Sequence, residues 1–130
     1  MRSLSLAAAA LITLGGAAPA HAAADPVPTP KRGLFLTVSG AENTWIRGVL
    51  LHCAPEPSGA HPQAAKACEA IARAGGDFDA LPDDPHACTK EFDPVTATVT
   101  GSYEGRAIDW RKTYPNACAM DVDTGYVFRF

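Results

Sequence analysis

Residues 1–22 have the order of a secretory signal peptide, and few of the residues beyond them could carry out hydrolase chemistry. Only three serines follow, Ser39, Ser58 and Ser102, and none lies in the G-x-S-x-G arrangement that exposes a nucleophilic serine on a tight turn. Cysteines in an exported chain are typically paired, which leaves no thiolate nucleophile. A Ser-His-Asp site can be assembled on many folds, but no motif here indicates one. We therefore expect that the chain is not an enzyme.

Two histidines lie close to cysteines, which raises the question of a metal site. His52 directly precedes Cys53, and His86 lies two residues before Cys88. Zinc ligands usually show C-x-x-C or H-x-x-x-H spacing, because both side chains must reach one ion, and neither spacing occurs. Adjacent residues of a strand point to opposite faces, so His52 and Cys53 would diverge. We expect surface histidines, no metal and no cofactor.

The four cysteines are better explained as disulfides. They are Cys53, Cys68, Cys88 and Cys118, and all lie in the part of the chain beyond the N-terminal leader. An even number in an exported chain favours two bonds, although spacing alone permits three pairings. Our first choice joins neighbours in sequence, 53 with 68 and 88 with 118.

The segment 87–92 has the composition of a loop that a protease could bind. It lies between Pro85 and Pro94, contains Cys88, presents the long cation of Lys90, and has neither helical nor strand periodicity. An extended backbone can add to the edge strands of a protease, and a lysine can fill a pocket that has a carboxylate at its base. Taken by itself, the segment is also compatible with an ordinary solvated loop.

The N-terminus predicts export. Met1 and Arg2 precede an apolar run and then Ala20-His21-Ala22, which is the order of a secretory signal peptide over residues 1–22. A flexible arm rich in Pro and Ala is expected at 23–32, followed by one domain at 33–130. Without Arg2, which lies in the signal peptide, the chain has 10 Lys and Arg residues and 14 Asp and Glu residues, a net charge of −4. This balance argues against nucleic-acid binding, and no apolar run is long enough to span a membrane.

The domain reads as an α+β fold. Small apolar residues form a helical stripe over 62–74, Gly75-Gly76 ends that helix, and Asp77 can cap a short turn through Leu81. Runs of β-prone residues predict five strands, at 34–38, 46–53, 95–100, 106–114 and 125–130. Short connections favour an antiparallel sheet with helices against one face.

Residues 53–71 closely resemble the signature of the Streptomyces subtilisin inhibitor family, C-x-P-x-x-x-G-x-H-P-x-x-x-x-A-C-x-x-L. Further similarity covers Cys88-Thr-Lys-Glu-Phe-Asp-Pro-Val95, the run from Gly105 to Tyr114, Asn116-Ala-Cys118 and the ending Val127-Phe-Arg-Phe130. The resemblance extends over about residues 33–130, which is nearly the whole domain.

This resemblance implies a secreted inhibitor of subtilisin-like and trypsin-like serine proteases that acts as a slowly cleaved substrate. It implies the following roles: Lys90–Glu91 as the reactive bond; Ala87, Cys88, Thr89 and Phe92 in the protease-contact loop; and Asn116 and Pro94 as loop supports. It also implies the bonds Cys53–Cys68 and Cys88–Cys118, a five-stranded antiparallel sheet with two α-helices on one face, and a homodimer.

The sequence departs from the family pattern at several positions. Ile71 replaces the usual leucine, residues 82–87 form a shortened segment, and Glu91 places a negative charge directly after the reactive bond. These differences bear on the strength and range of inhibition. Two alternatives stay open: a non-inhibitory secreted binding module of the same fold, and an inhibitor of a secreted metalloprotease.

Overall fold

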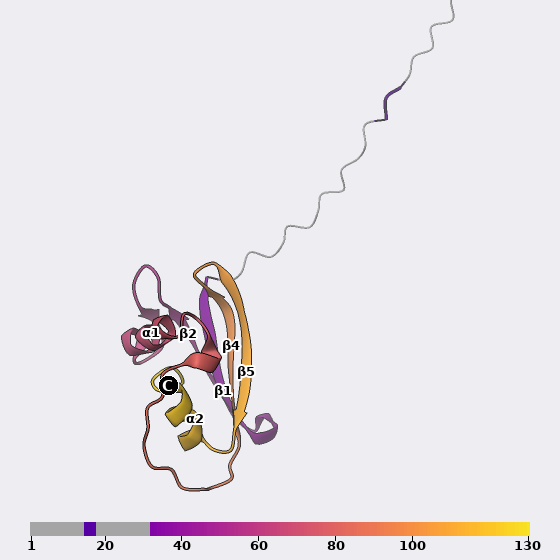
Figure 1. Ribbon diagram of the computed structural model, residues 1–130. Helices are drawn as coiled ribbons and strands as arrows, with labels where there is room; N and C mark the ends of the chain where they lie inside the picture. Colours follow the sequence, from indigo (N-terminus) through magenta and orange to yellow (C-terminus); the bar gives the residue numbers. More distant parts are fainter. Residues whose placement is uncertain (1–14, 18–31) are drawn as a thin grey trace, which may run out of the picture.

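A computed structural model describes residues 15–17 and 32–130 (Figure 1). The predicted signal peptide, 1–22, and arm, 23–32, fall almost entirely outside the described residues, so both boundaries stay predictions. Within the described part, no helix is long and apolar enough to cross a membrane.

The fold is built on a five-stranded antiparallel sheet with the order β3-β2-β1-β4-β5. The strands are β1 (Gly33–Gly40), β2 (Ile46–His52), β3 (Ser58–Gly59), β4 (Val95–Tyr103) and β5 (Arg106–Tyr114). Side chains alternate across β1, and Leu34, Leu36 and Val38 are fully buried on its inner face. The inner face of the sheet therefore forms one side of the core.

Two helices and a 3₁₀ turn cover that inner face (Figure 1). Helix α1 (Ala64–Arg73) buries the small stripe that includes Ala67 and Ile71, and it ends where Gly75 and Gly76 adopt positive φ. Asp77 caps the turn η2 (Phe78–Ala80) through a bond from the Asp79 N–H, as predicted. Helix α2 (Ala117–Thr124) completes the layer, so the predicted fold class is confirmed. A further 3₁₀ turn, η1 (Ala41–Asn43), connects β1 to β2.

The predicted strand at 125–130 is wrong. These residues form turns after α2, and the fifth strand is instead the two-residue β3, in the turn-rich run between Cys53 and α1. The alternation of Tyr126, Phe128 and Phe130 reflects packing rather than sheet pairing: the Phe128 ring stacks on Trp110 of β5 at 5.7 Å. A two-residue strand in a turn-rich run has no periodicity that a sequence could reveal.

Buried His61 holds the C-terminal segment in place. Its Nδ1 accepts a hydrogen bond from the Gln63 N–H at 3.0 Å, so Nε2 carries the proton and donates to the Val127 carbonyl at 2.9 Å. Val127 and Phe128 are fully buried. The segment therefore belongs to the core although it has no regular structure.

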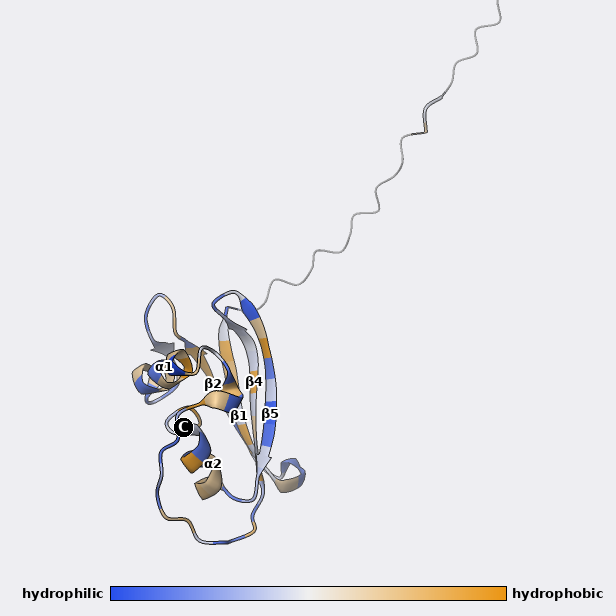
Figure 2. Ribbon diagram, in the orientation of Figure 1, coloured by the Kyte–Doolittle hydropathy of each residue, from blue (hydrophilic) through white to orange (hydrophobic). Residues whose placement is uncertain are grey.

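Helix α2 is tied to the edge strand β5 through Asp123. Tyr114 Oη donates to Asp123 Oδ2 at 2.6 Å, and Lys112 Nζ lies 3.0 Å from the same oxygen. β5 carries several hydrophilic side chains, so this contact joins the helix to the polar edge of the sheet (Figure 2). Burial alone would raise the pKa of Asp123, but the bonds from Tyr114 and Lys112 outweigh it and lower that pKa below its usual value.

We expect Asp123→Asn to lower the free energy of unfolding by about 1 kcal/mol near neutral pH, because the charge that accepts both bonds is lost and half-exposed ion pairs are partly screened. A depressed carboxyl pKa stabilises the fold above the unfolded pKa, and this stabilisation is lost as pH falls through the folded pKa. The gap between wild type and variant should therefore close below about pH 4 in urea unfolding. A gap of the same size in strong acid would contradict this assignment.

Candidate functional site

One long segment without helix or strand runs from the end of η2 to the start of β4 and curves past α2 (Figure 1). Residues 85–93 of this segment, which we call the exposed loop, are all solvent-exposed, and Phe92 has 82% of its surface accessible. Lys90 and Glu91 lie inside this loop, and both are exposed. The loop is therefore presented to solvent, with Pro94 half-buried where β4 begins.

Both predicted disulfides are present. Cys53–Cys68 joins the end of β2 to α1, and Cys88–Cys118 joins the exposed loop to α2, with Cα atoms 5.5 and 5.7 Å apart. The second bond attaches the loop two residues before Lys90. The chain thus has one disulfide in its core layer and one in its loop.

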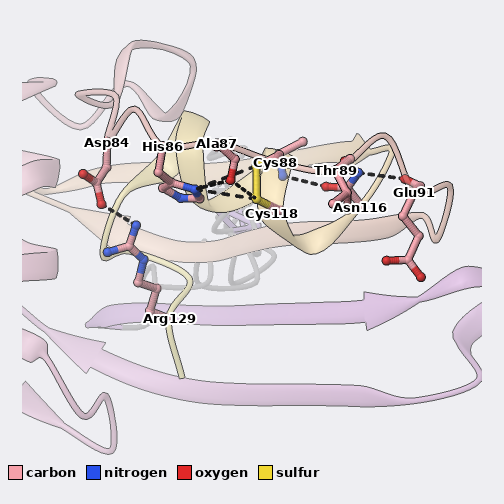
Figure 3. The surroundings of a disulfide bond; sticks show 10 residues. Asp84, His86, Ala87, Cys88, Thr89, Glu91, Asn116, Cys118 and Arg129 are labelled. Carbon is pink, nitrogen blue, oxygen red and sulfur yellow. Dashed lines mark hydrogen bonds and ion pairs between the residues drawn. A yellow bond between two sulfur atoms is a disulfide. The ribbon is translucent and has the colours of Figure 1, made fainter.

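Asn116 supports the loop on both sides of Lys90 (Figure 3). Its Nδ2 donates to the Glu91 carbonyl at 2.8 Å and, at 3.4 Å, to that of Thr89. Its Oδ1 accepts from the Ala119 N–H at 2.7 Å, which caps the N-terminus of α2. A single buried side chain therefore both starts the helix and fixes the backbone around residue 90.

Two aspartates hold the ends of the loop. The Asp93 N–H donates to the Pro115 carbonyl, and the Asp84 N–H to the Val122 carbonyl, each at 2.9 Å. The Asp84 carboxylate also forms an ion pair with Arg129 at 2.5 Å (Figure 3). Sequence reasoning missed Asp84 and Arg129, because a pair 45 residues apart produces no local pattern.

His86, Cys88 and Cys118 are the group of potential metal ligands that the described residues bring together, with ligand atoms within 4.8 Å of one another. Both cysteines are joined in a disulfide, so neither offers the thiolate that a metal ion would need. His86 Nδ1 instead lies 3.6 Å from Cys118 Sγ, against the disulfide. The group is part of the loop attachment and does not provide a metal site.

Fold and site together define a small disulfide-bonded domain that presents one extended peptide segment on a fixed support. The family model described as "Subtilisin inhibitor-like" matches residues 31–116. The chain therefore belongs to the subtilisin inhibitor-like family.

Curated relatives agree with this assignment. The chain is 40% identical to the "Subtilase-type protease inhibitor" of Streptomyces fradiae, over 98% of this chain and 92% of that protein. It is 46% identical to plasminostreptin of Streptomyces antifibrinolyticus, over 65% of this chain and 78% of that protein. The first of these names is that of a protease inhibitor, in agreement with the prediction that the chain is not an enzyme.

A solved structure shows the same fold. Streptomyces caespitosus sermetstatin, in its complex with Bacillus licheniformis subtilisin, superposes with a TM-score of 0.62 at 33% identity. The match covers 75% of this chain and 97% of sermetstatin. The antiparallel sheet and its two helices are therefore shared with a protein that is seen bound to a protease.

Two Asn116 variants should separate its roles. Asn116→Ala loses cap and loop bonds together and should lower the free energy of unfolding by about 1 kcal/mol. Asn116→Asp keeps an acceptor at a helix N-terminus that favours negative charge, so we expect it to be more stable than the alanine variant. Its carboxylate cannot donate to the two loop carbonyls, so residues 89–91 should become mobile. Urea unfolding and ¹⁵N relaxation would test this; an unchanged order parameter at Lys90 in Asn116→Asp would refute the supporting role.

Proposed function

We propose that this chain is an exported inhibitor of subtilisin-like and trypsin-like serine proteases, with Lys90–Glu91 as the reactive bond. The observation that carries the proposal is an exposed lysine whose neighbouring carbonyls, at Thr89 and Glu91, are both held by Asn116. The complex of sermetstatin with subtilisin, and the names of the Streptomyces relatives, support the choice of target. The N-terminal pattern of residues 1–22 supports export.

The loop would act as a substrate that cannot leave. The protease serine attacks the Lys90 carbonyl carbon, forming an ester, and the nitrogen of Glu91 leaves as an amine. Cys88–Cys118 retains one half of the cut loop, while Asn116 and the Asp93 N–H bond retain the other. The amine stays beside the ester, so religation competes with hydrolysis. A loop that is already fixed also loses little conformational entropy on docking.

Lys90 would determine which proteases bind. In a trypsin-like pocket its ammonium group meets a carboxylate, and in a broader subtilisin-like pocket its methylene stem can be buried while its charged end reaches water. Phe92, 82% exposed, offers a large apolar contact beyond the reactive bond. Ala87 offers a small one before it, with weak filling of an apolar subsite.

Titration of the purified protein against subtilisin and trypsin, with mass spectrometry of the complexes, tests the proposal. We expect tight inhibition of both and scission only between Lys90 and Glu91. Lys90→Asp should weaken trypsin inhibition by about 100-fold or more, because it places a carboxylate against the pocket carboxylate, and should affect subtilisin less.

The same titration separates the alternatives. Rapid digestion without inhibition would leave the fold in place and favour a non-inhibitory binding module. Inhibition of a metalloprotease, with no effect on either serine protease, would favour the second alternative. Either result would contradict the proposed reactive bond.

We also propose that two copies associate through the outer face of the sheet. Phe35 and the directly opposed Leu50 are 44% and 53% exposed, and Ile46 is 63% exposed. Phe35 covers Gly48, where an added Cβ would lie 2.9 Å from its ring. This apolar strip lies opposite the core, so a second copy could cover it without disturbing the helices.

Leu50→Asp should convert a dimer to a monomer in sedimentation equilibrium, because it places a charge at the centre of the strip. Phe92→Asp is the matched control: it also replaces an exposed apolar residue by aspartate, but on the loop, and should leave the dimer intact. A wild-type protein that sediments as a monomer would rule out the association.

A further inference from the structure

The N-terminal end of the loop is held by Asp84 in two ways. Its backbone N–H donates to the Val122 carbonyl at 2.9 Å, and its carboxylate pairs with Arg129 at 2.5 Å. Asp84 lies four residues before Cys88, so this attachment precedes the disulfide along the chain. The part of the chain that leads to Lys90 is thus fixed at two separate points.

Arg129 is itself held firmly. It directly follows Val127 and Phe128, both fully buried, and its guanidinium lies over the Tyr126 ring at 4.7 Å, which Lys66 also contacts at 4.6 Å. The Arg129 side chain is 23% exposed, the least exposed member of the ion pairs within the described part of the chain. Arg129 therefore offers Asp84 a cation whose position is set by the core.

A disulfide alone would leave the cut loop free to rotate. Once Lys90–Glu91 is cleaved, the half that ends in Lys90 retains the Cys88–Cys118 bond, the long hydrogen bond from Asn116 Nδ2 to the Thr89 carbonyl and the Asp84 contacts. Several single bonds connect Cα of Cys88 to α2, and rotation about them would swing the new Lys90 carboxyl away from the Glu91 amine. The contacts of Asp84 restrict that rotation, because they fix the direction in which the chain approaches Cys88.

From this geometry we propose that Asp84 and Arg129 are positioning residues for religation of the reactive bond. The inference rests on the proposed inhibitory function and extends it: the pair holds the Lys90 half of the cleaved loop in register with the Glu91 half. The pair acts on Lys90 through the backbone.

The measurement is the equilibrium ratio of cleaved to intact inhibitor, reached with a catalytic amount of subtilisin and read by mass spectrometry. Asp84→Asn keeps the backbone bond to Val122 and removes the charge, and Arg129→Gln removes the partner cation. Each should raise the ratio about two- to tenfold, the range expected for a partly buried ion pair. The double variant should match either single one, because both remove the same contact. Arg129→Lys should retain part of the effect.

Lys112→Gln is the matched control. It also removes a cation from an aspartate on the α2 side of the sheet, in a pair whose side chains are 45% and 41% exposed, but that aspartate does not hold the loop. It should lower the unfolding temperature, by somewhat less than Arg129→Gln because its pair is more exposed, and leave the ratio unchanged. Exchange of the pair, Asp84→Arg with Arg129→Asp, should return the ratio to within about twofold of wild type.

The outcomes separate the inference from the proposed function. A wild-type protein that is digested without inhibition would overturn both. Wild-type inhibition with an unchanged ratio in Asp84→Asn and Arg129→Gln, even with a lower unfolding temperature, would overturn this inference alone. A ratio that rises equally in Lys112→Gln would also overturn it, since loss of stability would then explain the effect.

Discussion

Both the oxygen and the nitrogen of the Asn116 side-chain amide form hydrogen bonds that shape the site. Its oxygen caps α2 and its nitrogen holds the carbonyls on either side of Lys90, so the helix and the loop depend on each other. An amide is suited to this position because it combines an acceptor and a donor in one planar group. At 9% exposure the group is largely shielded from water, which would otherwise compete for the same bonds.

The remaining supports lie close to Asn116 in sequence or follow it. Pro115 holds Asp93, Cys118 holds Cys88, and Val122 and Arg129 both hold Asp84. Their positions depend in turn on how α2 and the C-terminal turns pack against the sheet, through the Asp123 contacts and the stacking of Phe128 on Trp110. The described domain has about 100 residues, a size at which buried surface leaves a small margin, and disulfides help to fix the arrangement.

Sequence reasoning was reliable where one local rule decided the structure. Runs of β-prone residues predicted β1 and β5, small apolar residues with a glycine pair predicted α1 and its end, and cysteines that are neighbours in sequence predicted both disulfides. The resemblance supplied the second helix, which has no strong periodicity of its own. The prediction from the residue pattern failed at 125–130, where alternating aromatic residues pack into the core and do not pair in the sheet. The structure also explains the glycine of the signature, whose role the sequence does not reveal. Gly59 has φ +107, and a Cβ there would lie 2.2 Å from the Leu50 carbonyl oxygen. Glycine at this position therefore allows β3 to pair with β2.

The loop and its support have separate physical requirements. The side chains of Lys90, Glu91 and Phe92 are exposed and bury little surface, so their identity contributes little to the stability of the fold. Apart from the Cys88–Cys118 disulfide and the Asp84 carboxylate, the support acts on backbone carbonyls and N–H groups, and these groups are the same for almost any residue. The other side chains of the exposed loop can therefore change without loosening it. Because the loop's shape and its exposed chemistry are set by different atoms, substitutions of the exposed side chains would change what the loop presents to solvent and leave the fold that holds it unchanged.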